Sequence, residues 1–401
     1  MAETIAATTS AEAAADGDPT RLVVPRWPLS SRLKYAVIAF LWKRLILKPL
    51  LYYSEFKKYF IPPGENEPDH VKAYPVRKSL KVRIFFPPSY NPSTSSPETT
   101  TKLPTLLTCH GGGFLVGEPH DNDAWNRAFA KRHGFLVIAL DYSKGPRHRF
   151  PAAVHDVEAL VGCILADRSL PVDAARVAVA GWSAGGNLVL AASLLPSLRG
   201  RIRAAVPLYP LLDRATATAV KTRTRRYKPA LGGFRARDGD FVAPMMGLFD
   251  WASLRPGQRC DDPLVSPCYA PREHLPAGVF LIGCELDMLA HEAWRVACRL
   301  AGRRVPSLDE PVGREEAGGK GELVTGGDER FAWEEETAEE DGGLRVRWLL
   351  VPDTVHGFDQ SNIEGLVKDP VFMEDARIKT VKVIDLVGEW LLSGPLQATK
   401  S

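Results

Sequence analysis

Gly181-Trp182-Ser183-Ala184-Gly185-Gly186 is the most informative segment of this 401-residue chain. It follows the apolar run 177–180, which has the length of a strand, and it precedes the apolar segment 187–195, which predicts a helix. A G-x-S-x-G pattern alone is a weak signal, but a serine among such small neighbours between a strand and a helix is typical of a nucleophile elbow. The sharp turn is expected to direct the Ser183 hydroxyl outward at the carboxyl edge of a sheet.

A glycine run follows another strand candidate. His110-Gly111-Gly112-Gly113-Phe114 comes directly after the apolar run 106–109. Glycines let the backbone approach a substrate, and preorganised N–H groups stabilise the negative oxygen that forms during acyl transfer. We therefore predict an oxyanion hole made by the backbone N–H groups of Gly111, Gly112 and Ala184, with a plain flexible turn as the alternative.

The segment downstream of the serine offers a base and an acid. A serine needs a base, the base needs an orienting acid, and chains with this kind of elbow place them in the order serine, acid, histidine. Asp287 stands just after the apolar run 279–283, and His356 follows the predicted strand 344–351. Both are therefore expected in loops at the edge where Ser183 emerges, and we predict that Ser183, Asp287 and His356 form a catalytic triad.

Other residues compete for two of these roles. Glu285 and Asp353 are the next candidates for the acid, because they lie in the same two loops. His274 and His291 are the other histidines that follow the serine before His356, and neither ends a predicted strand. The order and the expected loop positions favour Asp287 and His356.

Strand and helix candidates alternate through the chain. Near-continuous apolar runs of strand length suit parallel strands that are covered on both faces. The strand candidates are 106–109, 135–140, 177–180 and 279–283, and the helix candidates are 151–168, 187–195 and 378–391. This alternation predicts an α/β fold with a mostly parallel central sheet and helices on both faces.

Over residues 103–392 the chain resembles the hormone-sensitive-lipase-like branch of the α/β-hydrolase superfamily. Besides the two glycine-rich motifs, it shares with that family Asp141-Tyr142, Phe150-Pro-Ala-Ala-Val-His-Asp156 and Asp262-Pro-Leu-Val-Ser266-Pro. The resemblance implies an α/β-hydrolase fold, the triad and oxyanion hole given above, and ester hydrolysis without a metal ion. It also implies a helical cap built from the N-terminal helices and the excursion after Asp213.

Two residues depart from the family pattern. Trp182 stands where an acidic residue usually precedes the serine, and Arg147 stands where the family has a glutamate. Neither position donates a catalytic group, so we expect altered support beneath the elbow rather than lost chemistry.

The chain divides into consecutive parts. They are a disordered lead (1–20), N-terminal cap helices (21–70), the first part of the α/β-hydrolase core (71–212), a cap insertion (213–262) and the second part of the core (263–401), which holds an acidic insertion (307–343). The insertion is rich in Gly and Glu and predicts a mobile surface segment. The basic stretch 221–228 predicts a solvated cap loop that balances the acidic insertion, with selection of an anionic substrate as the alternative.

Charge and cysteine content exclude other classes. The 51 Lys and Arg against 48 Asp and Glu leave a net charge of +3, which gives no case for nucleic-acid binding. The six cysteines are dispersed without a C-x-x-C pair, which is untypical of a zinc site or a disulfide scaffold.

The N-terminal residues bear on localisation. Residues 1–19 contain an acid at position 3 and no apolar core, so they do not form a secretory signal. The apolar segment 34–53 is interrupted by Lys43, Arg44 and Lys48, and its uncharged runs are too short to cross a bilayer. Two interpretations stay open: helices packed over the core or the substrate pocket, or a basic amphipathic segment on a membrane surface. We expect a cytoplasmic protein, with peripheral membrane contact as the alternative.

The predicted function is that of a serine esterase, which hydrolyses carboxylic esters of hydrophobic small molecules through an acyl-enzyme. Aromatic side chains of the N-terminal segment, taken as part of the cap, favour a hydrophobic substrate. They are Phe40, Trp42, Tyr52, Tyr53 and Phe56. A non-hydrolytic acyl transfer, elimination or cyclisation, and a non-catalytic ligand receptor, are the alternatives. No cofactor is expected, and the oligomeric state stays open.

Overall fold

The computed structural model describes residues 20–57, 60, 64–91, 102–337, 343–360, 363 and 367–398. The predicted disordered lead 1–20 therefore lies outside the described residues, apart from Thr20.

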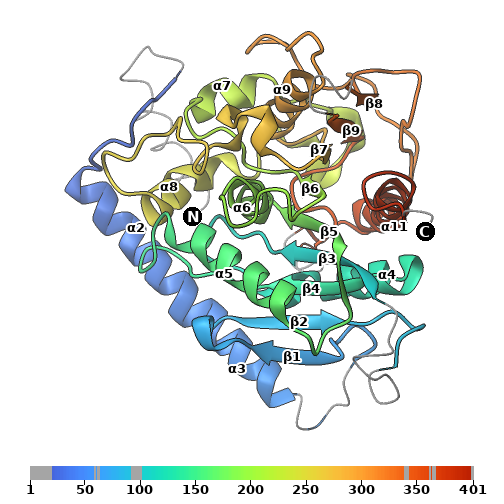
Figure 1. Ribbon diagram of the computed structural model, residues 1–401. Helices are drawn as coiled ribbons and strands as arrows, with labels where there is room; N and C mark the ends of the chain where they lie inside the picture. Colours follow the sequence, from blue (N-terminus) through green and yellow to red (C-terminus); the bar gives the residue numbers. More distant parts are fainter. Residues whose placement is uncertain are drawn as a thin grey trace.

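One sheet of nine strands runs through the described part of the chain, in the order β1-β2-β4-β3-β5-β6-β7-β9-β8 (Figure 1). The strands are β1 (His70–Ala73), β2 (Lys81–Phe85), β3 (Leu103–Cys109), β4 (Leu136–Leu140), β5 (Val172–Trp182), β6 (Ala204–Leu208), β7 (Gly278–Cys284), β8 (Ala332–Glu336) and β9 (Arg345–Val351). The strands from β4 to β9 in this order are parallel, whereas β1, β2 and β8 run antiparallel to their neighbours. The predicted α/β fold with a mostly parallel sheet is confirmed.

Helices cover both faces of the sheet (Figure 1). They are α2 (Leu29–Leu41), α3 (Lys48–Lys57), α4 (Asp123–His133), α5 (Ala152–Ala166), α6 (Ala184–Ser193), α7 (Thr218–Arg223), α8 (Met246–Ser253), α9 (Ala290–Leu300) and α11 (Pro370–Ser393). Helices α5, α6 and α9 contribute to the core on one face, and α4 and α11 contribute to the core on the other. The strand period of two residues explains this division, because Leu107 and Cys109 of β3 belong to the first core and Leu106 belongs to the second.

The apolar runs predicted four strands of the sheet and three of the helices. The four strand candidates lie within or overlap β3, β4, β5 and β7, and the helix candidates overlap α5, α6 and α11. Strands β1 and β8 were not predicted. Both lie at an edge of the sheet, and their mostly exposed or half-exposed side chains form no apolar run.

Over its described length the acidic insertion 307–343 packs against the rest of the chain, which the prediction of a mobile surface segment did not include. It contains β8, which pairs with β9, and it buries the side chains of Val312 and Phe331. The glutamates of β8 have cationic partners: Glu334 pairs with Arg345 of β9, and Glu335 pairs with Arg303 at 2.6 Å. This acidic run forms a strand in which arginines outside the run neutralise Glu334 and Glu335.

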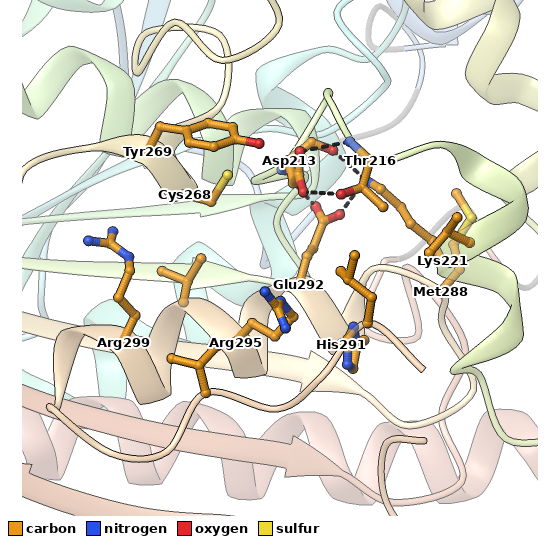
Figure 2. A pocket seen from close by; sticks show the side chains of 14 residues that line it. Asp213, Thr216, Lys221, Cys268, Tyr269, Met288, His291, Glu292, Arg295 and Arg299 are labelled. Atoms are coloured by element: carbon orange, nitrogen blue, oxygen red, sulfur yellow. Dashed lines mark hydrogen bonds and ion pairs between the residues drawn. The ribbon is translucent and has the colours of Figure 1, made fainter. Parts of the chain in front are cut away.

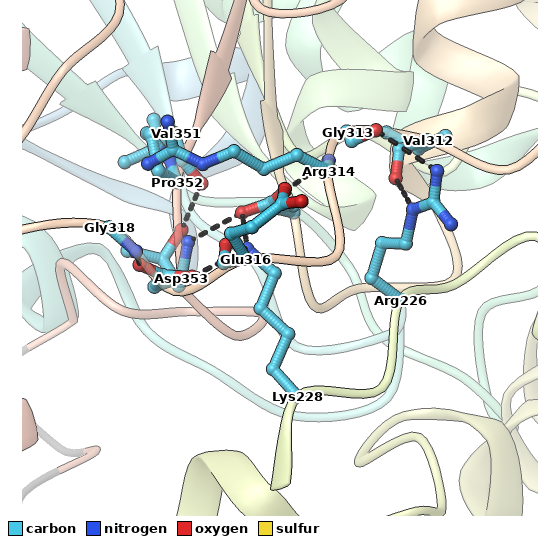
Figure 3. Close-up of polar contacts among 12 residues, drawn as sticks. Arg226, Lys228, Val312, Gly313, Arg314, Glu316, Gly318, Val351, Pro352 and Asp353 are labelled. Atoms are coloured by element: carbon cyan, nitrogen blue, oxygen red, sulfur yellow. Dashed lines mark hydrogen bonds and ion pairs between the residues drawn. The ribbon is translucent and has the colours of Figure 1, made fainter. Parts of the chain in front are cut away.

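The basic stretch 221–228 is solvated only in part: Arg223 and Tyr227 are exposed, whereas its two lysines are buried. The side chain of Lys221 is buried and pairs with Glu292 of α9 (Figure 2). Lys228 is fully buried and pairs with Glu285 and Asp353 (Figure 3). Long basic side chains that meet buried carboxylates enter the interior, and the sequence pattern does not reveal such partners.

The N-terminal helices form one continuous rod, in which α2 passes through a π-helical turn (Trp42–Leu47) into α3 (Figure 1). One face of α2 buries Tyr35 and Ala39 against α8, where the rings of Tyr35 and Trp251 lie 6.1 Å apart. The aromatic side chains that were expected to form part of a cap and favour a hydrophobic substrate mostly point outward instead. Phe40, Tyr52, Tyr53 and Phe56 are exposed. No described helix combines the length and the apolar character that a membrane span requires.

Candidate active site

Ser183 occupies the sharp turn between β5 and α6. Its φ of +53° lies in the left-handed region, and its N–H donates to the carbonyl of Leu208 on β6 at 2.9 Å. The small residues around it are sterically required, because a Cβ on Gly185 would lie 2.0 Å from the carbonyl oxygen of Cys109. Because α6 passes this close to the end of β3, only small residues permit the sharp turn from β5 into α6, as the sequence predicted for an elbow.

The structure brings the three predicted triad residues together. The Ser183 hydroxyl donates to Nε2 of His356 at 2.9 Å, and Nδ1–H of His356 donates to Oδ2 of Asp287 at 2.7 Å. Asp287 lies in the loop after β7 and His356 in the loop after β9, and these strands pair in register up to Cys284 and Val351. Neighbouring parallel strands thus deliver the acid and the base to one edge.

The electrostatics of His356 suit a general base. Burial lowers its pKa, but the carboxylate of Asp287 together with Asp240 and Asp359 outweighs that effect, and the pKa lies above its ordinary value. Asp287 is itself buried, at 1% exposure, so its charge acts on the imidazole with little screening by water. The arrangement favours proton transfer from Ser183 to an imidazole whose cation the carboxylate stabilises.

The competing acids are engaged elsewhere (Figure 3). Lys228 donates to Oε2 of Glu285 and to Oδ1 of Asp353, both at 2.7 Å, and all three side chains are at most 1% exposed. Glu285 also accepts from the N–H of Asp353 at 2.9 Å, which ties the acid loop to the base loop. The competing histidine His291 bonds to the carbonyl of Ser307 at 2.9 Å and not to a triad residue.

The glycine run lies against the serine. A Cβ on Gly111 would lie 3.4 Å from Cβ of Ser183, and the Gly111 carbonyl is held by the hydroxyl of Tyr142 at 3.0 Å. Among the hydrogen bonds of the described residues, no acceptor takes the N–H of Gly112. Ala184 is the first residue of α6, where N–H groups lack partners within the helix. The oxyanion hole of Gly111, Gly112 and Ala184 stays a prediction that this arrangement favours.

A polar cluster beneath the elbow was missed by the sequence analysis. Nε1–H of Trp182 donates to Oδ2 of Asp359 at 2.8 Å, and the Tyr209 hydroxyl donates to the same carboxylate. The Tyr209 ring also lies edge-on to His356, with ring centroids 4.8 Å apart. Burial raises the pKa of Asp359. A buried tryptophan N–H needs an acceptor, so the unusual Trp182 was the available signal.

The insertion 213–262, which is predicted to form part of a cap, also contacts the loop that carries Asp287. Asp240, from the insertion 213–262, accepts from the N–H of Met288 at 2.9 Å, next to Asp287. Burial and the nearby Asp287 raise the pKa of Asp240. In the described part of the chain, no three His, Cys, Asp or Glu side chains gather as metal ligands would.

An elbow serine, a histidine and an aspartate on a mostly parallel sheet define a class, and the chain belongs to the α/β-hydrolase fold family, whose sequence model matches residues 106–310. Within that family, it is a member of the hormone-sensitive-lipase-like branch.

Similar proteins include several esterases. The chain is 30% identical over 251 residues to an arylesterase of Saccharolobus solfataricus, a match that covers 62% of this chain and 74% of that one. It is 34% identical over 155 residues to an ethyl acetate hydrolase of Pseudomonas putida, which covers 37% of this chain and 45% of that protein. The solved structure of a Pyrobaculum calidifontis esterase aligns with a TM-score of 0.59 at 20% identity, over 92% of this chain and 100% of that one, which bears on the fold alone.

Proposed function

We propose that this ester-hydrolysing α/β hydrolase works through Ser183, His356 and Asp287. The observation that carries the proposal is the unbroken series of hydrogen bonds from the Ser183 hydroxyl through His356 to Asp287, at 2.9 and 2.7 Å. Family membership and the named esterases among its relatives support the reaction class.

Each residue has a defined task in this proposal. His356 takes the proton of Ser183 as the hydroxyl attacks the ester carbonyl, and it returns the proton to the leaving alcohol. Asp287 holds the imidazole in the tautomer with a proton on Nδ1 and stabilises its cation. The N–H groups of Gly111, Gly112 and Ala184 stabilise the oxyanion, and water activated by His356 then releases the acid.

We propose esters of hydrophobic small molecules as substrates. The support comes from the cap helix α8 rather than from α2, because Phe249 lies so close to the glycine run that a Cβ on Gly113 would be 2.3 Å from its ring. An aromatic side chain over the predicted oxyanion hole favours an apolar acyl or alcohol group.

A fluorophosphonate probe tests the proposed nucleophile. We expect intact mass spectrometry to show one adduct, peptide mapping to place it on Ser183, and Ser183→Ala to abolish it. An adduct on another residue contradicts the proposal. A panel of nitrophenyl esters on the same preparation then defines acyl preference, and added alcohols separate hydrolysis from acyl transfer by the transester that forms.

We also propose that the outer face of α2 contacts anionic membrane surfaces. Leu29, Leu33, Val37 and Phe40 recur at helical spacing and are 47–77% exposed. Residues 20–54 contain seven Lys and Arg and no Asp or Glu. An apolar stripe within a basic segment fits the interface of a bilayer that carries negative lipids.

Vesicle co-sedimentation tests this contact. We expect binding to phosphatidylserine-containing vesicles, weaker binding to neutral vesicles, and loss of binding in Leu33→Glu/Phe40→Glu. Val371→Glu, which adds a charge at another exposed apolar site, is the control. Equal binding of the double variant and the wild type contradicts the proposal.

A further inference from the structure

A pocket that no triad residue lines lies between α9 and the segment that leaves β6 (Figure 2). Its volume is about 240 Å³, room for a small organic molecule. Asp213 and Lys221 form part of one wall, and His291, Arg295 and Arg299 from α9 form part of another.

The acidic groups of this pocket are already satisfied. Asp213 accepts from the N–H groups of Ala215 and Thr216 at 2.8 and 3.0 Å, and from the Thr216 hydroxyl at 2.6 Å. Glu292 is paired with Lys221, and burial raises the pKa of Glu292 to about 7. The negative wall therefore has no need of a cation from a ligand.

The two arginines of the pocket, in contrast, lack anionic partners among the described residues. Arg299 donates from Nη2 to the carbonyl of Ala270 at 3.1 Å, and Arg295 donates to the carbonyl of Pro306. Among the described residues, neither guanidinium has a carboxylate partner, and the buried Nε of Arg299 has no acceptor. Burial lowers the pKa of Arg299, as expected for a cation without a neighbouring anion.

The net charge of the pocket favours an anionic ligand. Burial lowers the pKa of His291 to about 4, so this ring is neutral near pH 7. Arg295, Arg299 and Lys221 against Asp213 and Glu292 leave one positive charge in excess when Glu292 is ionised, and two when it is protonated. The lining also has apolar side chains, which are Val220, Val296, Val305 and Leu308.

We propose that this pocket binds a small monoanionic carboxylate with an apolar body, held by Arg295 and Arg299. The planar fork of a guanidinium matches a carboxylate, and the valines and the leucine cover its hydrocarbon part. Met288 also lines the pocket and is the neighbour of Asp287, so an occupant touches the segment that carries the triad acid. If the proposed function holds, ester hydrolysis itself releases this class of molecule, and the pocket is a site for the acid product.

Binding is tested on the enzyme whose Ser183 has been blocked with a fluorophosphonate, so that the active site cannot take up the ligand. Calorimetric titration uses butyrate and benzoate, with butyramide and benzamide as neutral probes of the same shape. We expect binding of the carboxylates alone, at least tenfold weaker in Arg299→Gln, and unchanged in Arg377→Gln, which alters an exposed arginine of α11.

Three results overturn the proposal: no binding of either carboxylate, equal binding of the amides, or unchanged affinity in Arg295→Gln/Arg299→Gln with the melting temperature preserved. Failure of the proposed function is seen separately, because Ser183 is then not labelled. The titration can in that case be repeated on Ser183→Ala.

Discussion

The loops after β7 and β9 carry two charged clusters of opposite design. Asp287 and His356 face the hydroxyl of Ser183, and the imidazole side chain keeps 12% of its surface exposed. Glu285 and Asp353, two and three residues earlier in the same loops, close around Lys228 with at most 1% exposure. In the proposed mechanism the first cluster exchanges a proton with a substrate, whereas the second is sealed from solvent and holds the two loops together. The same kinds of side chain thus serve chemistry or architecture according to access.

The sealed cluster also joins parts that are distant in sequence. Lys228 comes from the cap insertion and reaches the carbonyl of Glu316 at 2.9 Å, and Glu285 accepts from the N–H of Arg314 at 2.8 Å. The predicted cap insertion, the acidic insertion and the loops after β7 and β9 therefore meet at the ammonium group of Lys228 (Figure 3). We infer that the geometry of Asp287 and His356 depends on this junction.

Removal of the nucleophile has the largest expected effect on the open cluster. Ser183→Ala should lower kcat by about 10⁶-fold, since members of a triad act as one unit. The melting temperature should stay near that of the wild type, because the Ser183 side chain takes no part in the buried ion-pair cluster around Lys228. Nitrophenyl butyrate turnover and thermal melts measure both. Retention of more than about one hundredth of the activity would sink the assignment.

Asp287→Asn should lower kcat by about 10⁴-fold, because the amide favours the wrong tautomer of His356. The pH profile tests the direction of the effect on the pKa of His356. Asp287 raises the pKa of His356, and the base works only when neutral, so the acid limb of kcat/KM should lie above about 6.5 in the wild type and move down in the variant. Glu336→Gln, which removes an exposed carboxylate of β8, is the control, and its acid limb should stay in place. If the acid limb of kcat/KM does not move in Asp287→Asn, Asp287 is not the partner that raises the pKa of His356.

Lys228→Met tests the sealed cluster. It leaves two carboxylates buried without a cation, which costs about 3–5 kcal/mol of unfolding free energy. We expect kcat to fall while KM changes little, because the loops of Asp287 and His356 lose their common support. Urea unfolding and steady-state kinetics measure the two effects. Lys320→Met, at a lysine with 58% exposure, is the control and should change neither. Loss of stability with full kcat would leave Lys228 a structural residue only.

The two clusters also differ in how well sequence predicts them. Ser183 and the glycine run follow apolar strands directly, and the steric demand of the elbow is local, so a few adjacent residues reveal it. Asp287 and His356 need only the additional rule that parallel strands end at one edge. Lys228 meets its partners across 57 and 125 residues, and Trp182 meets Asp359 across 177. Such pairs leave no periodicity, so charge runs looked solvated and β8 was missed.

The cluster beneath the elbow should give a smaller effect. Trp182→Phe removes the N–H that Asp359 accepts and should cost about 1–3 kcal/mol of stability beyond the lost ring volume. Trp125→Phe is a matched control, because its ring packs on Trp182 with centroids 5.1 Å apart and its buried Nε1 has no partner among the described residues. Thermal melts compare the two. Equal losses would show that the hydrogen bond to Asp359 contributes nothing.

The smallest loss of stability is expected when a surface ion pair is removed. Glu334→Gln removes the ion pairs with Arg345 and Arg347 and keeps an oxygen that accepts from Nε1–H of Trp390, now 3.0 Å away. Because these charged side chains are 21–30% exposed, water and salt screen them, and the loss should be at most about 1 kcal/mol. Near 1 M NaCl, where the Debye length is about 3 Å, the difference from the wild type should vanish, whereas the loss in Lys228→Met should persist. Denaturation at low and high salt decides this: if both variants respond alike to salt, burial is not what separates the two kinds of cluster.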